Sequence, residues 1–440
     1  MVIARINIWN QFVGAVLWDE TSETASFEVD TSFVKTGFDL SPIKMPLAEL
    51  QRGNLIYSFP GLPKQTYHGL PGLLADSLPD KFGNEIIDAW LARQGRTPQS
   101  MNPVERLCYI GKRAMGALEY EPAMQQHGNN SVALEIDELV KLAREAIEIK
   151  TGLDTHMDDK DSLLNIIKVG TSAGGARAKA VIAYNPDTKE VRSGQLEVPA
   201  GFTHWLLKLD GVTNDELGDP KGYGRIEYAY YKMAVSCGIE MSESKLLEEH
   251  GRAHFMTRRF DRLPGNEKLH MQTLCGLAHY DYNQPTTYSY EQAFQVMRDL
   301  RLEHAEAVQL YKRMVFNVLA RNQDDHTKNI SFLMNKEGRW KLAPAYDVTY
   351  AFNPTNIWLS QHQLSINGKR KNILETDLLA IAREISLKKA RGIIQEIASA
   401  VANWPTYARE AGVPEKQMEA IQKVQLKYSD LAGNTRLEMP

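Results

Sequence analysis

The 440-residue sequence has few cysteines, no long apolar run and almost no excess charge. Its three cysteines, Cys108, Cys237 and Cys275, are odd in number and far apart, which is typical of reduced thiols in a cytoplasmic protein. No apolar stretch approaches the roughly 20 residues that a membrane-spanning helix needs, so we expect no membrane partner. The net charge of −4 excludes wholesale coating of nucleic acid, although a local basic patch could still contact DNA.

A chain of this length predicts more than one domain. Strand-like alternation at 2–8 and 12–18 indicates a strand-rich N-terminal subdomain over 1–125. The polar stretch 124–133 is typical of a linker, and it predicts a linker with a connecting helix over 126–150. Strands near 180–184, 204–209 and 253–259, with a helix near 225–237, predict an α/β lobe over 151–262. Helical periodicity then dominates, so we expect a mainly helical lobe over 263–440 and an α+β fold of two lobes.

The chemistry of the chain is indicated by the stretch 324–347. Asp324 is followed five residues later by Asn329, and Asp347 comes 18 residues after Asn329, beyond an apolar run. An aspartate can orient the proton of an attacking hydroxyl, while an asparagine and a second aspartate can supply oxygen ligands to Mg²⁺. The pattern is common by itself, but the apolar helix before it and the strand after it would hold it rigidly. We therefore predict a phosphoryl-transfer site.

A glycine-rich loop at 170–179 is the candidate cradle for phosphates. Glycines let backbone N–H groups converge on an anion, and Arg177 and Lys179 add positive charge at the exit of the loop. The loop matches no standard phosphate-binding pattern, so a flexible hairpin loop stays an alternative. The residues that we expect to approach the nucleotide here are Ser172, Ala173, Gly174, Gly175, Arg177 and Lys179.

Lys208 is the candidate cation for the phosphates of ATP. It lies among leucines in a strand-like stretch, as the phosphate-contacting lysine of protein kinases does. Glu227, on the following helix, is a candidate ion-pair partner for it. The alternatives are an edge-strand lysine that reaches solvent and a glutamate on a solvated helix face. His326 has no second histidine at metal-ligand spacing, so we expect it to brace the loop by hydrogen bonding.

Over essentially its whole length the chain resembles the HipA-type toxin serine/threonine kinases of bacterial type II toxin–antitoxin modules. The resemblance is carried by 78–80 (LPD), the glycines at 111 and 116, the loop 172–179, 259–262 (RFDR), 324–329 (DDHTKN) and 346–347 (YD). It implies a two-lobed fold like that of protein kinases, with the ATP-binding lobe at 151–262 and the catalytic lobe at 263–440. It also implies that Asp324 is the catalytic aspartate, that Asn329 and Asp347 bind Mg²⁺, and that Lys208 contacts ATP. By the same likeness, Ser172 is an autophosphorylation site, and Phe260, His326 and Lys328 belong to nucleotide-binding motifs.

Two positions depart from the family pattern. Asp325 stands where the family has glycine, and its carboxylate could crowd the metal site or add an outer ligand. Arg258 stands before the RFDR motif, where an acidic residue is familiar in the hinge that faces the nucleotide. If the hinge contacts adenine only through its backbone, the second change is silent.

The resemblance also implies partners. The family works with a small DNA-binding HipB-like antitoxin, so the pair would corepress an operator, and the protein substrate would be a translation component of the aminoacyl-tRNA synthetase class. Lys388, Lys389 and Arg391 are expected to form a basic helix face that could touch DNA phosphates, with a merely solvated face as the alternative. Two other functions stay open: a small-molecule or lipid-type kinase, and a catalytically idle corepressor bound to DNA.

Overall fold

The computed structural model describes residues 3–79, 81–122, 135–136, 139–141, 143, 178–194, 197–212 and 222–432. The chain divides into two compact units. Unit 1 comprises 1–224, 243–272 and 333–339, and unit 2 comprises 225–242, 273–332 and 340–440. The glycine-rich loop at 170–177, with Ser172, Ala173, Gly174, Gly175 and Arg177, lies outside the described residues, as does most of the expected linker. The four-segment division predicted from the sequence stays a prediction.

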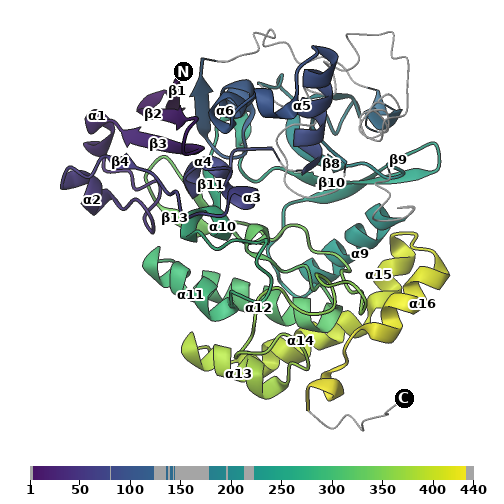
Figure 1. Ribbon diagram of the computed structural model, residues 1–440. Helices are drawn as coiled ribbons and strands as arrows, with labels where there is room; N and C mark the ends of the chain where they lie inside the picture. Colours follow the sequence, from purple (N-terminus) through teal and green to yellow (C-terminus); the bar gives the residue numbers. More distant parts are fainter. Residues whose placement is uncertain are drawn as a thin grey trace. The chain divides into compact units, whose positions relative to one another are not determined.

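The first sheet of unit 1 is antiparallel and has the strand order β4-β3-β2-β1-β5 (Figure 1). The paired strands expected near 2–8 and 12–18 are confirmed, because Ile6 of β1 lies opposite Gly14 of β2. Side chains of β1 alternate between exposed and buried, as a half-buried strand requires. Its strands are β1 (Ile3–Ile8), β2 (Gln11–Asp19), β3 (Thr24–Val29), β4 (Ile56–Tyr57) and β5 (Leu118–Glu121).

The second sheet of unit 1 is also antiparallel, in the order β7-β6-β8-β10-β9. One face packs against helix α5 (Lys81–Arg93), with Ile86, Trp205 and Leu207 in a shared core. Side chains alternate along a strand, so the neighbours of these residues in β8 lie on the opposite face. The strands are β6 (Lys179–Tyr184), β7 (Val191–Ser193), β8 (Thr203–Lys208), β9 (Ser244–Glu249) and β10 (Arg252–Arg258).

The other helices of unit 1 are short and precede this second sheet in the chain. Helix α6 begins with a complete capping box, in which Asn102 and Glu105 each accept the backbone N–H of the other. Strand β11 (His270–Thr273) comes after the RFDR motif. The helices are α1 (Thr31–Val34), α2 (Leu47–Gln51), α3 (Lys64–Tyr67), α4 (Gly72–Ala75) and α6 (Pro103–Ile110).

Unit 2 is mainly helical. Its central helix α12 (His304–Ala320) buries an apolar stripe that includes Met314, Phe316 and Leu319, and it packs beside α14 (Figure 1). Strand β12 (Ser331–Met334) begins in unit 2 and ends in the segment 333–339 of unit 1, and β13 (Trp340–Leu342) belongs to unit 2. The N–H of Ala343 donates to the carbonyl of Ser331. The other helices are α9 (Tyr223–Ser236), α10 (Leu274–Ala278), α11 (Tyr290–Asp299), α13 (Glu375–Glu384), α14 (Ala390–Ala402), α15 (Trp404–Glu410) and α16 (Glu415–Val424).

The expected α+β class, with strands concentrated early and helices late, is confirmed. Within the described residues, no helix combines the length and the apolar character needed to cross a membrane.

Candidate active site

The loop that carries the candidate catalytic residues begins where α12 ends. Arg321 has φ +59°, a left-handed conformation that stops the helix, and residues 322–326 then lead to a short 3₁₀ turn at Thr327–Asn329. From residue 324 to residue 327 the side chains alternate in exposure, as in a strand. Asp325 and Thr327 are buried, whereas Asp324 and His326 are partly exposed.

Asp324 presents its carboxylate at the surface of unit 2, with a side chain 48% exposed. Its backbone carbonyl accepts a hydrogen bond of 2.7 Å from the side-chain Nδ2 of Asn329. This bond closes the turn, and because it engages the amide nitrogen, the amide oxygen of Asn329 is left as the atom that can bind a ligand. Asp324 and Asn329, five residues apart in the sequence, are therefore in direct contact.

Asp325 lies in the core of unit 2, with a side chain 2% exposed. Its carboxylate accepts hydrogen bonds from the Tyr290 hydroxyl at 2.9 Å, from His362 Nδ1 at 2.8 Å and from the Gln363 N–H at 2.8 Å. Burial alone would raise the pKa of Asp325, but His362 and the other two donors hold this pKa below its ordinary value. Both carboxylate oxygens are thus engaged by the protein, so Asp325 has a structural role beside the candidate metal ligands.

His326 does not brace the loop with its side chain, contrary to our expectation. Its Nε2 lies 3.8 Å from the Asp324 carboxylate, beyond hydrogen-bond distance, and its ring packs 5.5 Å from that of Tyr282. The Lys328 ammonium lies over the same Tyr282 ring at 4.7 Å. The brace comes from the backbone instead, because the carbonyl of His326 accepts the N–H of Asn329 at 2.9 Å.

Asn329 and Asp347 line one pocket in unit 2. Asp347 has φ +52°, a conformation that is strained for a non-glycine residue and that concentrates at functional sites. Four residues further on, Ala351 bridges the start of the loop, because its carbonyl accepts the N–H of Gln323 at 2.9 Å. The remaining lining residues are Tyr290, Leu310, Arg313, Asn317, Asn322, Asp325, His326, Ile330, Ala345, Tyr346 and Val348.

The donor set of this pocket suits a hard cation that shares its coordination with a ligand. Mg²⁺ is bound in such sites through one or two protein oxygens together with water and phosphate oxygens, and Asn329 and Asp347 offer a set of this kind. Among the described residues there is no group of three or more His, Cys, Asp or Glu side chains that could hold a metal by themselves. The residues therefore fit an ion brought with a nucleotide rather than a closed structural metal site.

Unit 1, taken by itself, carries a row of three residues across its second sheet. Lys179 of β6 lies directly opposite Lys208 of β8, and Lys208 lies opposite Phe255 of β10. The Lys208 ammonium is 5.7 Å from the Phe255 ring centroid, and Lys179 is buried. Strand β8 is central in its sheet, so Lys208 is not an edge-strand lysine. Like charges directly opposite each other across strands are unfavourable, and this cost is relieved where an anion binds both.

The other residues expected near the nucleotide lie at the end of this sheet or in unit 2. Arg258 is the last residue of β10, where its N–H donates to the Glu243 carbonyl at 2.8 Å, and Phe260 is half-buried. Glu227 is buried on α9, which belongs mainly to unit 2. Its pairing with Lys208 and the hinge role of Arg258 and Phe260 stay predictions.

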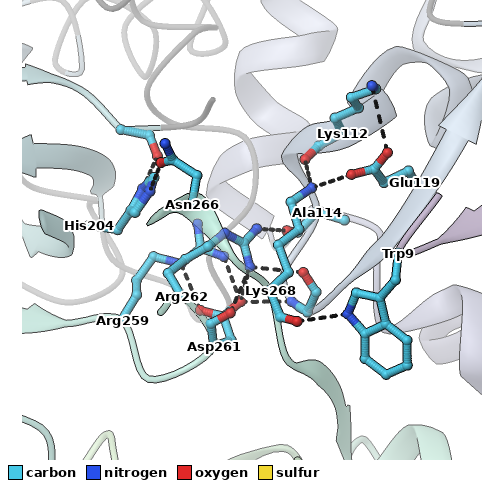
Figure 2. A network of polar contacts seen from close by, with 12 residues as sticks. Trp9, Lys112, Ala114, Glu119, His204, Arg259, Asp261, Arg262, Asn266 and Lys268 are labelled. Carbon is cyan, nitrogen blue, oxygen red and sulfur yellow. Dashed lines mark hydrogen bonds and ion pairs between the residues drawn. The ribbon is translucent and has the colours of Figure 1, made fainter. Parts of the chain in front are cut away.

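The RFDR motif forms a buried ionic cluster inside unit 1 (Figure 2). We call Arg259, Asp261 and Arg262 the Arg–Asp–Arg cluster. The Asp261 carboxylate accepts hydrogen bonds from Arg259 at 2.7 Å, from Arg262 at 2.8 Å and from the N–H of Gly116 at 2.7 Å. Burial opposes ionisation of Asp261, but the two arginines hold its pKa far below the ordinary value. The motif therefore braces β10 against the Gly116 turn.

Gly116 can be replaced by no other residue without disturbing this brace. It has φ +77°, and a Cβ there would lie 2.9 Å from the backbone nitrogen of Met271. Its carbonyl accepts a hydrogen bond from Arg262 at 2.8 Å. The glycine and the RFDR motif, far apart in the sequence, are thus parts of one structure.

The expected basic helix face near the C-terminus is wrong in its geometry. Helix α14 begins at Ala390, so Lys388 and Lys389 lie in the turn before it, and only Arg391 is helical. Arg391 is exposed and lies 3.5 Å from Glu375 of α13. Cations at a helix N-terminus are disfavoured by the helix dipole.

Several polar residues around the pocket were missed by sequence reasoning. Arg313 is buried on α12, donates to the Ala343 carbonyl at 2.6 Å, and burial lowers its pKa to about 10. Asn317 donates to the Tyr290 hydroxyl at 3.0 Å and accepts from Asn322 at 2.9 Å. Their helical spacing placed Arg313 and Asn317 on one face of a helix, but no local motif marked them.

Comparison with known proteins identifies related chains. A family model described as the HipA-like C-terminal domain matches residues 171–404, and another, described as the HipA N-terminal domain, matches residues 4–121. A protein of Haemophilus influenzae named "Putative kinase" is 26% identical over 134 residues, 28% of this chain. "Putative kinase Y4mE" of Sinorhizobium fredii is 24% identical over 193 residues, 41% of this chain. The match spans 39% of the length of each relative.

One solved structure has the same fold over nearly the whole chain. It is a chain of the Shewanella oneidensis MR-1 complex of the toxin–antitoxin proteins HipA and HipB with their operator DNA. The superposition has a TM-score of 0.63 and 17% sequence identity, and covers 98% of this chain and 96% of that one. At this identity the likeness establishes the fold.

Proposed function

The chain belongs to the HipA family, and from this membership we propose that it is an ATP- and Mg²⁺-dependent serine/threonine protein kinase, the toxin of a toxin–antitoxin pair. The observation that carries the proposal is the loop 324–329. Asp324 is held at the surface by the Asn329 side chain, and Asn329 shares a pocket with Asp347. These are the residue types, in the chain order, that phosphoryl transfer needs.

In this proposal Asp324 orients the attacking hydroxyl of a serine or threonine and accepts its proton. Its exposure of 48% leaves room for a protein substrate to approach. Asn329 and Asp347 hold the cation through their side-chain oxygens, and the bound Mg²⁺ supplies neutralisation of phosphate charge. Strained backbone conformations are concentrated at functional sites, and the backbone of Asp347 has such a conformation.

Lys179 and Lys208 hold the phosphates of ATP from one face of the second sheet of unit 1. Two ammonium groups in register on neighbouring strands form a site for a polyphosphate. Ser172, in the glycine-rich loop, is the autophosphorylation site. A phosphate there adds about −1.5 to −2 charge beside an anion site, so it would repel ATP and switch the kinase off.

The proposed partners follow from family membership and from the fold shared with a chain of a HipA–HipB–operator complex. We propose a HipB-like antitoxin, operator DNA bound through the complex, and a protein substrate among the aminoacyl-tRNA synthetases. Lys388, Lys389 and Arg391 are a weak candidate for contact with DNA phosphates. Their replacement with alanine should lower the salt dependence of operator binding by the complex.

The proposal is tested by incubating the purified protein with ATP and Mg²⁺ and mapping the phosphorylated residues by mass spectrometry. We expect one dominant mark at Ser172, lost in Asp324→Asn. Turnover of ATP without a phosphoprotein product would favour a small-molecule kinase instead. No binding of ATP at all would favour a catalytically idle corepressor. A strong mark that survives Asp324→Asn would remove the assignment of Asp324.

A further inference from the structure

We infer that Asp325 and His362 are positioning residues that fix the orientation of Asp324. The inference rests on the proposed function and deepens it. Asp325 is the immediate neighbour of Asp324 in a segment whose burial alternates as in a strand, so the two side chains lie on opposite sides of the backbone. Whatever fixes Asp325 therefore also fixes the direction in which the Asp324 carboxylate points.

Asp325 is anchored from two other parts of unit 2. We call Tyr290, Asp325, His362 and Gln363 the Asp325 cluster. Tyr290 begins helix α11, while His362 and Gln363 come later in the chain than Asp347, and together they give one carboxylate three donors at 2.8–2.9 Å. A buried carboxylate with three donors in different directions cannot rotate without leaving a donor unpaired, so its position is fixed.

The donors are themselves held in place. The carbonyl of Gln363 accepts a hydrogen bond from Arg370, and Arg370 also donates to the carbonyl of Tyr288 at 2.9 Å. The N–H of His362 donates to the Arg370 carbonyl at 3.1 Å. The His362 ring is 2% exposed, so it has no room for another orientation. The anchor of Asp325 is therefore rigid.

A second anchor holds the loop at Thr327, which follows His326 in the chain. The Thr327 hydroxyl donates to the Tyr280 carbonyl at 2.6 Å, and the Tyr280 ring stacks on that of Tyr288 at 4.6 Å. Since Arg370 also contacts Tyr288, the two anchors belong to one frame. Residues 325 and 327 point into this frame, and residue 324 points out of it towards solvent.

Loss of the anchor should affect the chemical step more than nucleotide binding. A displacement of about 1 Å in a catalytic group can cost on the order of 10²-fold in rate. Tyr290 and Asp325 line the pocket of Asn329 and Asp347, but His362, the residue to be replaced, does not, and it is not in the row of Lys179 and Lys208 that we propose to hold phosphates. We therefore expect a fall in kcat with little change in KM for ATP.

The experiment compares His362→Leu, which removes the donor, with His362→Asn, whose amide can donate to Asp325 in place of Nδ1. His304→Leu is the matched control, because His304 is exposed on α12 and, within the part of the chain that the structure describes, its side chain bonds only the Ile385 carbonyl. We expect His362→Leu to lower kcat about 10- to 100-fold with KM for ATP within about threefold. His362→Asn should recover most of the activity, and His304→Leu should match the wild type.

A second readout does not depend on kinase activity. Amide hydrogen exchange of the peptide covering 322–330 should be faster in His362→Leu, and near the wild-type rate in His362→Asn. If the wild type transfers no phosphate, the proposed function fails, and the exchange result alone decides the anchor. Unchanged exchange in His362→Leu would overturn the inference. So would a loss of activity that only follows the fraction of unfolded protein, or an equal loss in both His362 variants.

Discussion

Asp324 and Asp325 are consecutive carboxylates in opposite environments: the first is 48% exposed, and the second is 2% exposed and accepts three hydrogen bonds. The buried carboxylate holds the loop, and the exposed one is accessible to a ligand. One carboxylate cannot do both, because a carboxylate that accepts hydrogen bonds from its own protein is no longer available to a ligand. In the sequence both positions carry the same side chain, and no neighbouring residue indicates this division.

The two aspartates should differ in their effect on stability. Asp325→Ala leaves His362 and Tyr290 buried without an acceptor and should lower the free energy of unfolding by about 3–5 kcal/mol. Asp324→Ala removes an exposed group and should change it by no more than about 0.5 kcal/mol. Urea unfolding of both variants at pH 7 measures the difference. Equal effects would contradict the described burial.

Replacement of Asp324, which should hardly change stability, should strongly lower the rate of phosphate transfer. Asp324→Asn should lower phosphate transfer by about 10²–10⁴-fold while the protein stays folded. Asp299→Asn is the control, because Asp299 is an exposed aspartate of the same unit. Rates are measured from the transfer of the terminal phosphate of ATP. A normal rate in Asp324→Asn would show that another group accepts the proton.

Asp261 should be among the most sensitive positions of unit 1. Asp261→Asn removes the counter-charge of Arg259 and Arg262, both buried, and should cost about 3–5 kcal/mol of stability. Glu337→Gln serves as the comparison, because its ion pair with Arg339 is exposed and worth at most about 1 kcal/mol. Denaturant titrations test this contrast. A small loss for Asp261→Asn would mean that the arginines find water or other partners.

Stability should fall on mild acidification, because two buried histidines are held neutral in the folded protein. Burial lowers the pKa of both His204 and His270 from 6.5 to about 4. A depressed folded-state pKa means that the unfolded chain takes up the proton first. The two neutral rings therefore contribute fully to the free energy of unfolding above pH 6.5. This contribution is lost as the pH falls from about 6.5 to about 4, with a slope of at most about 1.4 kcal/mol per pH unit for each ring.

The measurement is the unfolding midpoint in urea at pH 7 and pH 5, for the wild type and for His204→Gln and His270→Gln. Each variant should show a weaker dependence on pH than the wild type. The carboxylates of Asp261 and Asp325 cannot imitate this, since their pKa values lie below the ordinary 3.8 and they act only in stronger acid. An unchanged pH dependence in both variants would count against neutral buried rings.

Lys208→Met should weaken the binding of ATP about 10- to 100-fold, because a charge-assisted contact with phosphate is lost. Lys179→Met should have a similar effect, and Lys189→Met, in an exposed turn of the same sheet, should have none. The readout is the rise in melting temperature with added ATP, which grows with ligand concentration over Kd. An equal rise in all three variants would place the nucleotide elsewhere.

Local patterns were enough to predict much of this molecule. The strands β1 and β2 follow from alternation, and the closeness of Asp324 and Asn329 follows from a five-residue turn. Asp347 lines the same pocket as Asn329, at the 18-residue spacing that the sequence indicated, with β12 and β13 between them. Short-range spacing determines all of these features.

Features that depend on distant partners could not be predicted. Asp325 binds Tyr290 and His362, which lie 35 and 37 residues away, and nothing in the neighbouring sequence marks either one. The RFDR motif was recognised, but its contact with Gly116, 145 residues away, was not. The basic helix face failed for a local reason, because the start of α14 at Ala390 leaves two of its three cations in a turn.

The separation of 37 positions between Asp325 and His362 has a consequence for biosynthesis. A nascent chain that has emerged only as far as residue 361 already contains Asp324, Asn329 and Asp347, but it lacks two of the three donors to Asp325. The ribosome therefore synthesises Asp324, Asn329 and Asp347 before it synthesises His362 and Gln363, the two later donors to Asp325. Under the proposed function, we expect catalytic activity only after residues 362 and 363 have been synthesised, because shorter fragments carry the complete motif without these two donors.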